Sequence, residues 1–134
     1  LRSGPVFWMD TADSQPCIAT AGLIVWKLVC TGRLFHSGWS RYGINAIELA
    51  MEVLSELQRR FYKEYPPCEH DRAYKFAQSS TMKPTRWEMP PSSINIIPGE
   101  CSISGDIRLL PFYDCEEAMQ KIRGWVEEID ANLE

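Results

Sequence analysis

Hydrophobic and polar residues alternate most clearly in two stretches, and this alternation predicts two β-strands. In residues 23–31 (LIVWKLVCT), one set of alternate positions is wholly apolar and the other mixes valines and a leucine with Lys27 and Thr31. Residues 100–110 alternate more cleanly, with the large apolar side chains of one face at Cys101, Ile103, Ile107 and Leu109. Successive side chains of a strand point to opposite faces of a sheet, so each strand has one core face and one more polar face.

A third strand is predicted over residues 81–89, and Pro84 within it restricts its position. Proline cannot donate a hydrogen bond to a neighbouring strand, so we expect this strand at an edge of the sheet. The residues before it, 66–80, read as a polar connection. Residues 94–99, in which Asn95 stands among aliphatic side chains, read as a transition between elements.

Two amphipathic helices are predicted where apolar residues recur at spacings of three and four. The first begins after a capping Asn45 and ends before Pro66, because a residue that precedes proline is pushed out of helical geometry. Its apolar stripe is Ile47, Ala50, Leu54, Leu57 and Phe61. The second helix begins after Asp114 and carries the stripe Ala118, Ile122, Trp125, Val126, Ile129 and Leu133. Gly124 lies inside this helix without an explanation in the sequence.

The order strand, helix, strand, strand, helix predicts an α+β fold of the split, ferredoxin-like type, β-α-β-β-α(-β). Both helices should cover one face of an antiparallel sheet and leave the face that carries Arg108 open. The last strand of this pattern is absent, and we expect it to pair beside residues 23–31.

The chain of 134 residues is long enough for one globular domain, and 45% of its residues are hydrophobic. Its formal net charge of -4, without a block of like charges, argues against nucleic acid or an anionic membrane as a partner. No signal peptide or membrane-spanning segment is recognised. The cysteines are odd in number and lack C-x-x-C spacing, so we expect reduced thiols in an intracellular, cytoplasmic protein, with an organelle as the alternative. They are Cys17, Cys30, Cys68, Cys101 and Cys115.

Two candidate sites lie at the ends of predicted elements. His36 follows the first strand in a loop between Gly32 and Gly38, where structural and catalytic roles both fit. Asp10 follows a short apolar run and precedes a turn. Either Asp10 or Asp13 starts that turn through its side chain, or one of them binds a metal ion.

Other polar residues also leave two readings open. Asn95 either satisfies buried backbone groups or faces a ligand. Arg108 either forms an exposed ion pair with Asp106 or binds a carboxylate in a bidentate manner. Cys68 and His70 belong to a polar loop or supply two metal ligands, although no further ligand stands nearby.

Three motifs in fixed order add a resemblance to a known family. They are HSGWSRYGINAIE at residues 36–48, NIIPG at 95–99 and DIR at 106–108. Together they resemble the lid, or dimerisation, domain of the zinc amidohydrolases that include acetylornithine deacetylase, succinyl-diaminopimelate desuccinylase and glutamate carboxypeptidase. The runs DTADSQPCIATAG and WKLVCTGRLFHSG are most similar to the acetylornithine deacetylase members.

The resemblance implies a domain plan and a set of site residues. Residues 1–21 would end a catalytic-domain strand and cross over, and residues 22–134 would form an incomplete lid. His36 would enter the partner subunit's active site and polarise the scissile carbonyl. Asn95, Gly99 and Arg108 would bind substrate, Arg108 through the substrate carboxylate. Asp10, with Asp13 as the alternative, would be the acidic zinc ligand.

The function implied is that of a homodimeric, zinc-dependent enzyme. It would hydrolyse N-acyl amino acids such as N-acetylornithine in arginine biosynthesis, with zinc, or cobalt in its place, held mainly by an absent catalytic domain. The parent protein would be the enzyme, and this chain alone would be inactive. The alternative is a stand-alone ferredoxin-like module that binds a small molecule or mediates dimerisation without catalysis, because the same fold supports both.

Overall fold

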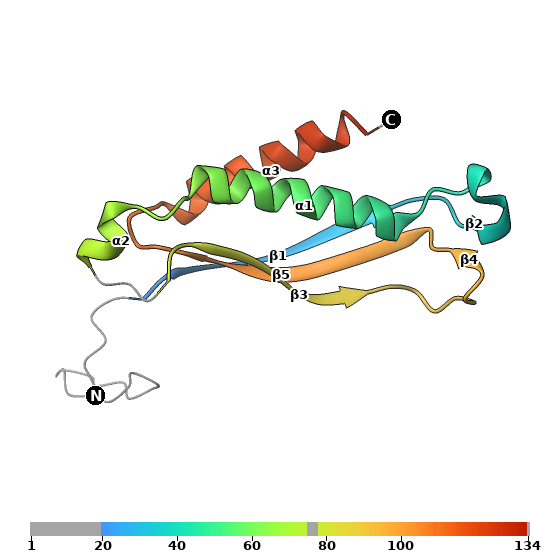
Figure 1. Ribbon diagram of the computed structural model, residues 1–134, viewed down its shortest axis with the longest axis horizontal. Helices are drawn as coiled ribbons and strands as arrows, with labels where there is room; N and C mark the ends of the chain where they lie inside the picture. Colours follow the sequence, from blue (N-terminus) through green and yellow to red (C-terminus); the bar gives the residue numbers. More distant parts are fainter. Residues whose placement is uncertain (1–19, 75–77, 134) are drawn as a thin grey trace, which may run out of the picture.

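The computed structural model describes residues 20–74 and 78–133 (Figure 1). A three-stranded antiparallel sheet forms one layer, in the order β1 (Gly22–Thr31), β5 (Glu100–Leu109) and β3 (Thr81–Glu88). Helices α1 (Ala46–Glu64) and α3 (Cys115–Asp130) form the second layer and cover one face (Figure 1). The prediction of an antiparallel sheet with two helices on one face is therefore confirmed.

The sheet register places Pro84 in an edge strand, as the sequence predicted. Trp26 of β1 lies opposite Gly105 of β5, and Pro84 of the edge strand β3 lies opposite the same glycine. The β3 register shifts between Pro84 and Arg86, as expected where proline interrupts the ladder. The strands predicted over 81–89 and 100–110 each end one residue earlier.

Helix ends follow the capping residues expected from the sequence. The Asn45 side chain accepts a hydrogen bond from the Ile47 N–H at 3.0 Å, and Asp114 accepts from the N–H groups of Glu116 and Glu117. Each bond satisfies a donor that the first helical turn leaves free.

The core lies between the helices and the covered sheet face. Full burial of each large apolar side chain contributes about 1.5–3 kcal/mol relative to exposure, so this layer contact stabilises the fold. The largest fully buried side chains are Phe61, Met82, Cys101, Ile103, Ile107 and Leu109. Cys30 and Cys101 face each other across β1 and β5 as buried free thiols, in keeping with their predicted packing role.

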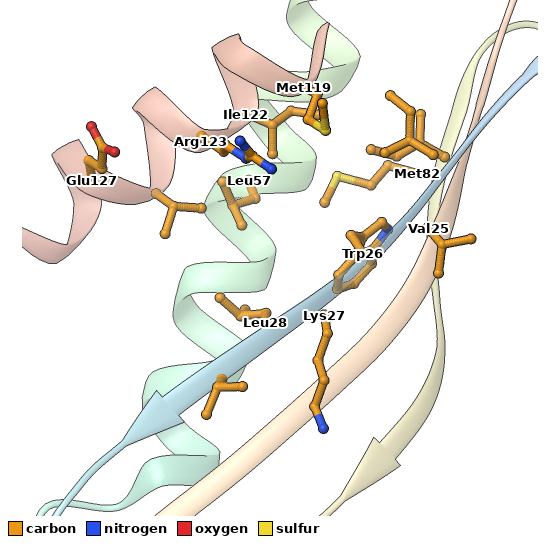
Figure 2. Close-up of a pocket in the computed structure, with 14 residues that line it drawn as sticks. Val25, Trp26, Lys27, Leu28, Leu57, Met82, Met119, Ile122, Arg123 and Glu127 are labelled. Atoms are coloured by element: carbon orange, nitrogen blue, oxygen red, sulfur yellow. The ribbon is translucent and has the colours of Figure 1, made fainter. Parts of the chain in front are cut away.

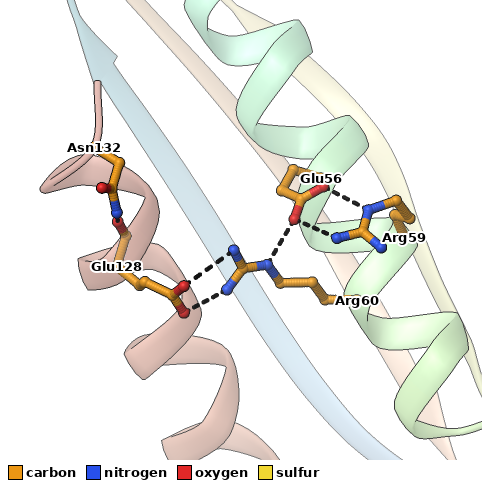
Figure 3. A network of polar contacts seen from close by, with 5 residues as sticks. All are labelled: Glu56, Arg59, Arg60, Glu128 and Asn132. Atoms are coloured by element: carbon orange, nitrogen blue, oxygen red, sulfur yellow. Dashed lines mark hydrogen bonds and ion pairs between the residues drawn. The ribbon is translucent and has the colours of Figure 1, made fainter. Parts of the chain in front are cut away.

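An ion-pair network joins the two helices at the surface (Figure 3). Arg60 of α1 contacts Glu56 one turn earlier at 2.7 Å and Glu128 of α3 at 2.6 Å. Arg59 also bonds to Glu56, at 2.6 Å. Hydrogen bonds from both arginines lower the pKa of Glu56 to about 2.

Four short elements were not predicted. Strands β2 (Phe35–His36) and β4 (Ile96–Ile97) pair with each other, and a 3-10 helix, η1 (Ser37–Tyr42), follows β2. The prediction that 66–80 is only a polar connection was wrong, because it contains helix α2 (Glu69–Ala73). The buried Asp71 carboxylate fixes this segment by accepting hydrogen bonds from Ser79 and Cys68.

The face of the sheet opposite the helices is open, as predicted. Val25 and Val29 of β1 and Arg108 of β5 are exposed there. The finer ferredoxin-like assignment needs a fourth strand beside β1, and it remains a prediction because the described residues supply only three strands in this sheet. None of the helices that the structure describes has the length and apolar character needed to cross a membrane.

Candidate functional site

The β2–β4 pair forms a small tip beyond one end of the main sheet (Figure 1). His36 pairs with Ile96 in this ladder, and the Ser37 N–H donates to the Asn95 carbonyl oxygen at 2.9 Å. The ladder thereby brings together His36 and Asn95, which are 59 residues apart in the chain. These are two of the predicted site residues.

A backbone hydrogen bond sets the proton position of His36. The Gly38 N–H donates to Nδ1 of His36 at 3.0 Å, in the first turn of η1. Because Nδ1 acts as an acceptor, the neutral imidazole must carry its proton on Nε2. The ring therefore presents an N–H donor at Nε2.

Asn95 places its amide against that donor. Its Nδ2 atom lies 3.2 Å from His36 Nε2, a hydrogen-bond distance at which the direction depends on the ring tautomer. With the proton on Nε2, a half-turn of the amide lets Oδ1 of Asn95 accept from Nε2–H. An entering carbonyl oxygen could replace Oδ1 as the acceptor, and the Asn95 amide N–H could then donate to the same oxygen, as oxyanion-stabilising donors do.

The glycine of the NIIPG motif has a packing role in the tip. The Gly99 carbonyl accepts a hydrogen bond from the Gly32 N–H at 2.9 Å. A Cβ atom at Gly99 would lie 3.1 Å from the backbone nitrogen of Leu34, closer than ordinary contacts. Gly99 thus lets the two tip segments approach, and its predicted contact with substrate remains a prediction.

Arg108 lies far from this pair. It is on the open face near the opposite end of β5, its side chain is 57% exposed, and its Nε donates to Asp106 at 2.7 Å. Eight residues separate it from Glu100, at the tip end of the strand, which corresponds to about 25 Å. A single small ligand cannot contact Arg108 and His36 of the same chain.

No zinc site is formed by the described residues. Within 20–74 and 78–133, no three histidine, cysteine or acidic side chains gather closely enough to hold a metal ion. The Cys68 thiol instead donates to Asp71 at 3.0 Å, and the His70 ring packs on Phe112 at 5.3 Å between centroids. Asp10 and Asp13 lie outside the described residues.

An apolar groove of about 450 Å³ runs between β1 and α3 (Figure 2). Trp26, Leu57 and Met82 lie on its floor, and Arg123 of α3 stands at its rim. The Trp26 indole N–H is buried and has no partner in the part of the chain that the structure describes. The predicted fourth strand would lie along this groove, which contains no convergent catalytic groups.

Sequence reasoning missed the group that fixes the imidazole and left two readings of Asn95 open. The reading in which Asn95 satisfies buried backbone groups is wrong, because its side chain is exposed and contacts His36. The Gly38 hydrogen bond was not predicted. Its only signal is a glycine two residues after a side chain that can cap a turn.

The fold and this site can be compared with known proteins. Residues 18–134 match the family described as peptidase dimerisation domain, and the chain belongs to that family. It is 55% identical over its whole length to acetylornithine deacetylase of Arabidopsis thaliana. It is 48% identical over 98% of its length to acetylornithine deacetylase of Dictyostelium discoideum. The chain spans about 30% of the length of each of these relatives.

Solved structures share the fold at low identity. A putative aminohydrolase of methicillin-resistant Staphylococcus aureus aligns with a TM-score of 0.64 at 18% identity, over 83% of this chain and 27% of that chain. A metallo-carboxypeptidase of Sulfolobus solfataricus aligns with a TM-score of 0.59 at 19% identity, over 86% and 42% respectively. These likenesses support the fold.

Proposed function

We propose that this chain is the lid, or dimerisation, domain of a zinc-dependent amide hydrolase that deacylates N-acyl amino acids, with N-acetylornithine as the substrate. The identity of 55% to a curated acetylornithine deacetylase supports this activity, which would belong to arginine biosynthesis. The observation that carries the site is the contact between the His36 imidazole and the Asn95 amide at the tip. The enzyme would be a cytoplasmic homodimer joined through its lid domains.

The two donors have a defined task in this reaction. Negative charge develops on the carbonyl oxygen of an amide as it is attacked, and donors aimed at that oxygen lower the barrier. His36 would donate from Nε2 while Gly38 holds Nδ1, and Asn95 would supply the second N–H. Neither residue needs to exchange a proton to act in this way.

The zinc would be held outside the described residues. When bound, such an ion activates water and polarises a carbonyl. We place its ligands in the remainder of the parent protein, with Asp10, or Asp13 in its place, as the ligand from this chain and cobalt as a substitute metal. Residues 1–21 would then lead from the catalytic domain into the lid formed by residues 22–134.

The separation of the candidate residues favours a dimer in which each lid serves two active sites. Arg108 is about 25 Å along the strand from the tip, so it cannot share a small substrate with His36 of its own chain. Arg108 would bind the substrate carboxylate in its own subunit. His36 and Asn95 would reach the active site of the partner subunit.

Replacement of His36 in the full-length parent tests this proposal. We expect His36→Ala to lower kcat by about 10²–10³-fold, the usual cost of losing one such donor, with metal content unchanged. The matched control is His70→Ala, which removes the other histidine, packed on Phe112 away from the tip, and should leave kcat unchanged. Equal activity of both variants would contradict the proposed role of His36.

A further inference from the structure

Two cysteines face each other in the core, outside the candidate site. Cys30 of β1 and Cys101 of β5 are directly paired in the sheet, and both belong to one buried cluster beneath α1. Both are free thiols, with exposed fractions of 8% and 0%. Residues paired across neighbouring strands lie on the same face of a sheet, so the two thiols share the covered face.

The hydrogen-bond pattern between β1 and β5 sets the distance between the two cysteines. The Gly32 N–H donates to the Gly99 carbonyl oxygen at 2.9 Å, two residues beyond the cysteine pair on each strand. Hydrogen-bonded and non-hydrogen-bonded pairs alternate along antiparallel strands, so Cys30 and Cys101 form a hydrogen-bonded pair, with Cα atoms about 5.5 Å apart. Disulfides span Cα separations of about 4.4–6.8 Å, so this pair is within range.

The two side chains would have to move closer together before a disulfide could form. Opposite Cβ atoms of antiparallel strands are about 4.5–5.5 Å apart, whereas a disulfide holds them at about 3.5–4.5 Å. Formation of the bond would therefore pull β1 toward β5 and strain the sheet at this pair. Strained disulfides are more easily reduced and are typical of reversible, regulatory bonds.

One of the two thiols can be reached from solvent. A hollow of about 190 Å³ between β1 and the two long helices is lined by Cys30, together with Leu49, Val126 and Asp130. A small peroxide fits this space, since a water molecule takes up about 30 Å³ in the liquid. Cys30 is thus the thiol that an entering peroxide would meet, and Cys101 lies opposite it across the sheet.

We infer that Cys30 and Cys101 act as a redox-responsive pair, which hydrogen peroxide oxidises to a reversible disulfide between β1 and β5. The Cys30 sulfur attacks one peroxide oxygen and the O–O bond breaks, which leaves a sulfenic acid and one water molecule. The Cys101 sulfur then attacks the Cys30 sulfur. The S–O bond breaks, and the hydroxyl group leaves with the Cys101 proton as a second water molecule. The two thiols lose two electrons, which the peroxide gains.

The reaction should be slow. Burial raises the pKa of both thiols, and at Cys30 the neighbouring Cys101 and Asp130 add to this effect. Since the thiolate is the nucleophile, a raised pKa leaves little of the reactive form. The pair therefore responds to sustained exposure to peroxide and not to a brief pulse.

The disulfide would act at the place where the tip joins the main sheet. Gly32 and Gly99 are each two residues from a cysteine, and their backbone hydrogen bond ties the two tip segments together. Gly32 also packs so closely on the Ile44 carbonyl group that a Cβ atom would not fit. A shift of β1 toward β5 would therefore displace the tip that carries His36 and lower activity. This consequence rests on the proposed function, whereas formation of the disulfide does not.

Peptide mapping of the full-length parent tests whether the disulfide forms. Trypsin releases Cys30 in residues 28–33 and Cys101 in residues 87–108, and neither peptide contains another cysteine. After treatment with hydrogen peroxide and alkylation of the remaining thiols, we expect these two peptides to be linked and dithiothreitol to separate them. If both cysteines are alkylated as in the untreated protein, or if Cys30 is oxidised without a link to Cys101, the inference is refuted.

The activity of the same samples measures the consequence for the tip. We expect kcat of the oxidised parent to fall in proportion to the linked fraction and to recover with dithiothreitol. Cys30→Ala should form no link and keep its kcat under the same treatment. Cys115→Ala, at a half-buried cysteine of α3, should respond like the wild type.

The outcomes separate this inference from the proposed function. A linked parent with full kcat would overturn the effect on the tip, while low activity of His36→Ala would still support the proposed function. Full activity of His36→Ala would refute the proposed function, and the peptide map would still decide whether Cys30 and Cys101 form the disulfide.

Discussion

At the scale of single residues, two glycines differ in whether the structure leaves room for a side chain. Gly105 of the central strand lies under the Trp26 indole, and a Cβ atom there would approach Trp26 Cζ2 to 2.5 Å and also meet the Lys83 carbonyl oxygen. Gly124 of α3 has no atom within 4 Å of such a Cβ among the described residues. Close packing therefore requires glycine at position 105, whereas no contact among the described residues requires it at position 124.

This contrast predicts stability changes of opposite sign in the 134-residue chain. Gly105→Ala should lower the free energy of unfolding by about 1–3 kcal/mol or more, the usual cost of overpacking. Gly124→Ala should raise it by up to about 1 kcal/mol, because alanine favours the helix and restricts the unfolded chain. Urea unfolding followed by circular dichroism measures both. A Gly105→Ala chain as stable as the wild type would contradict the packing described for Gly105.

The site residues show how much of the site could be predicted from the sequence. The motifs pointed to His36, Asn95 and Arg108, and the alternation of β5 placed Arg108 on the open face. The contact between His36 and Asn95 could not be predicted, because it depends on a ladder of two residue pairs between distant segments. The direction of the His36 proton depends on one backbone N–H of Gly38, which leaves no periodic signal in a sequence.

At the scale of elements, the length of a helix or strand decided whether the sequence predicted it. The α1 helix, with 19 residues, and α3, with 16, are long enough for an apolar stripe to repeat, and their caps are explicit. The α2 helix, with five residues, shows no such repeat, and it is held by hydrogen bonds that Asp71 accepts from Cys68 and Ser79. The two-residue strand β4 likewise owes its existence to its partner β2 and not to its composition.

The contact between α1 and α3 predicts a pH dependence of stability. The folded chain holds the pKa of Glu56 at about 2, below its ordinary value of 4.5, through Arg59 and Arg60. A lowered pKa means that the ionised carboxylate stabilises the fold above pH 4.5 and that this contribution is lost as pH falls toward 2. Glu56→Gln should therefore lower Tm at pH 7.

The same difference should shrink as the pH is lowered. Thermal unfolding of wild type and Glu56→Gln between pH 7 and pH 2 measures the difference in Tm, which we expect to diminish between about pH 4.5 and 2. The control is Glu52→Gln on the same helix, which should show a smaller change because no ion pair of Glu52 is found among the described residues. A difference in Tm that is constant with pH would exclude the Glu56 carboxylate as its source.

At the scale of the whole molecule, the sheet separates two groups of candidate residues. His36 and Asn95 contact each other at the tip, which is formed by β2 and β4 (Figure 1). Arg108 is the second-last residue of β5, near the strand end away from the tip. The sequence predicted the layers because burial patterns report which face is covered. It could not predict this separation, because the resemblance assigns roles to residues without placing them relative to one another. The separation supports the proposed dimer, in which active sites are shared between subunits.

Mixed dimers of the full-length parent test this central claim most directly. His36→Ala and Arg108→Ala homodimers are each expected to be nearly inactive, and they are combined so that subunits exchange. If His36 acts on the partner's site and Arg108 on its own, each mixed dimer contains one site with both residues intact and one site with neither. Equal mixing should then restore about a quarter of the wild-type activity. If activity stays at the level of the two homodimers while native mass measurement shows mixed dimers, both residues of a site come from the same subunit and the shared-site arrangement is contradicted.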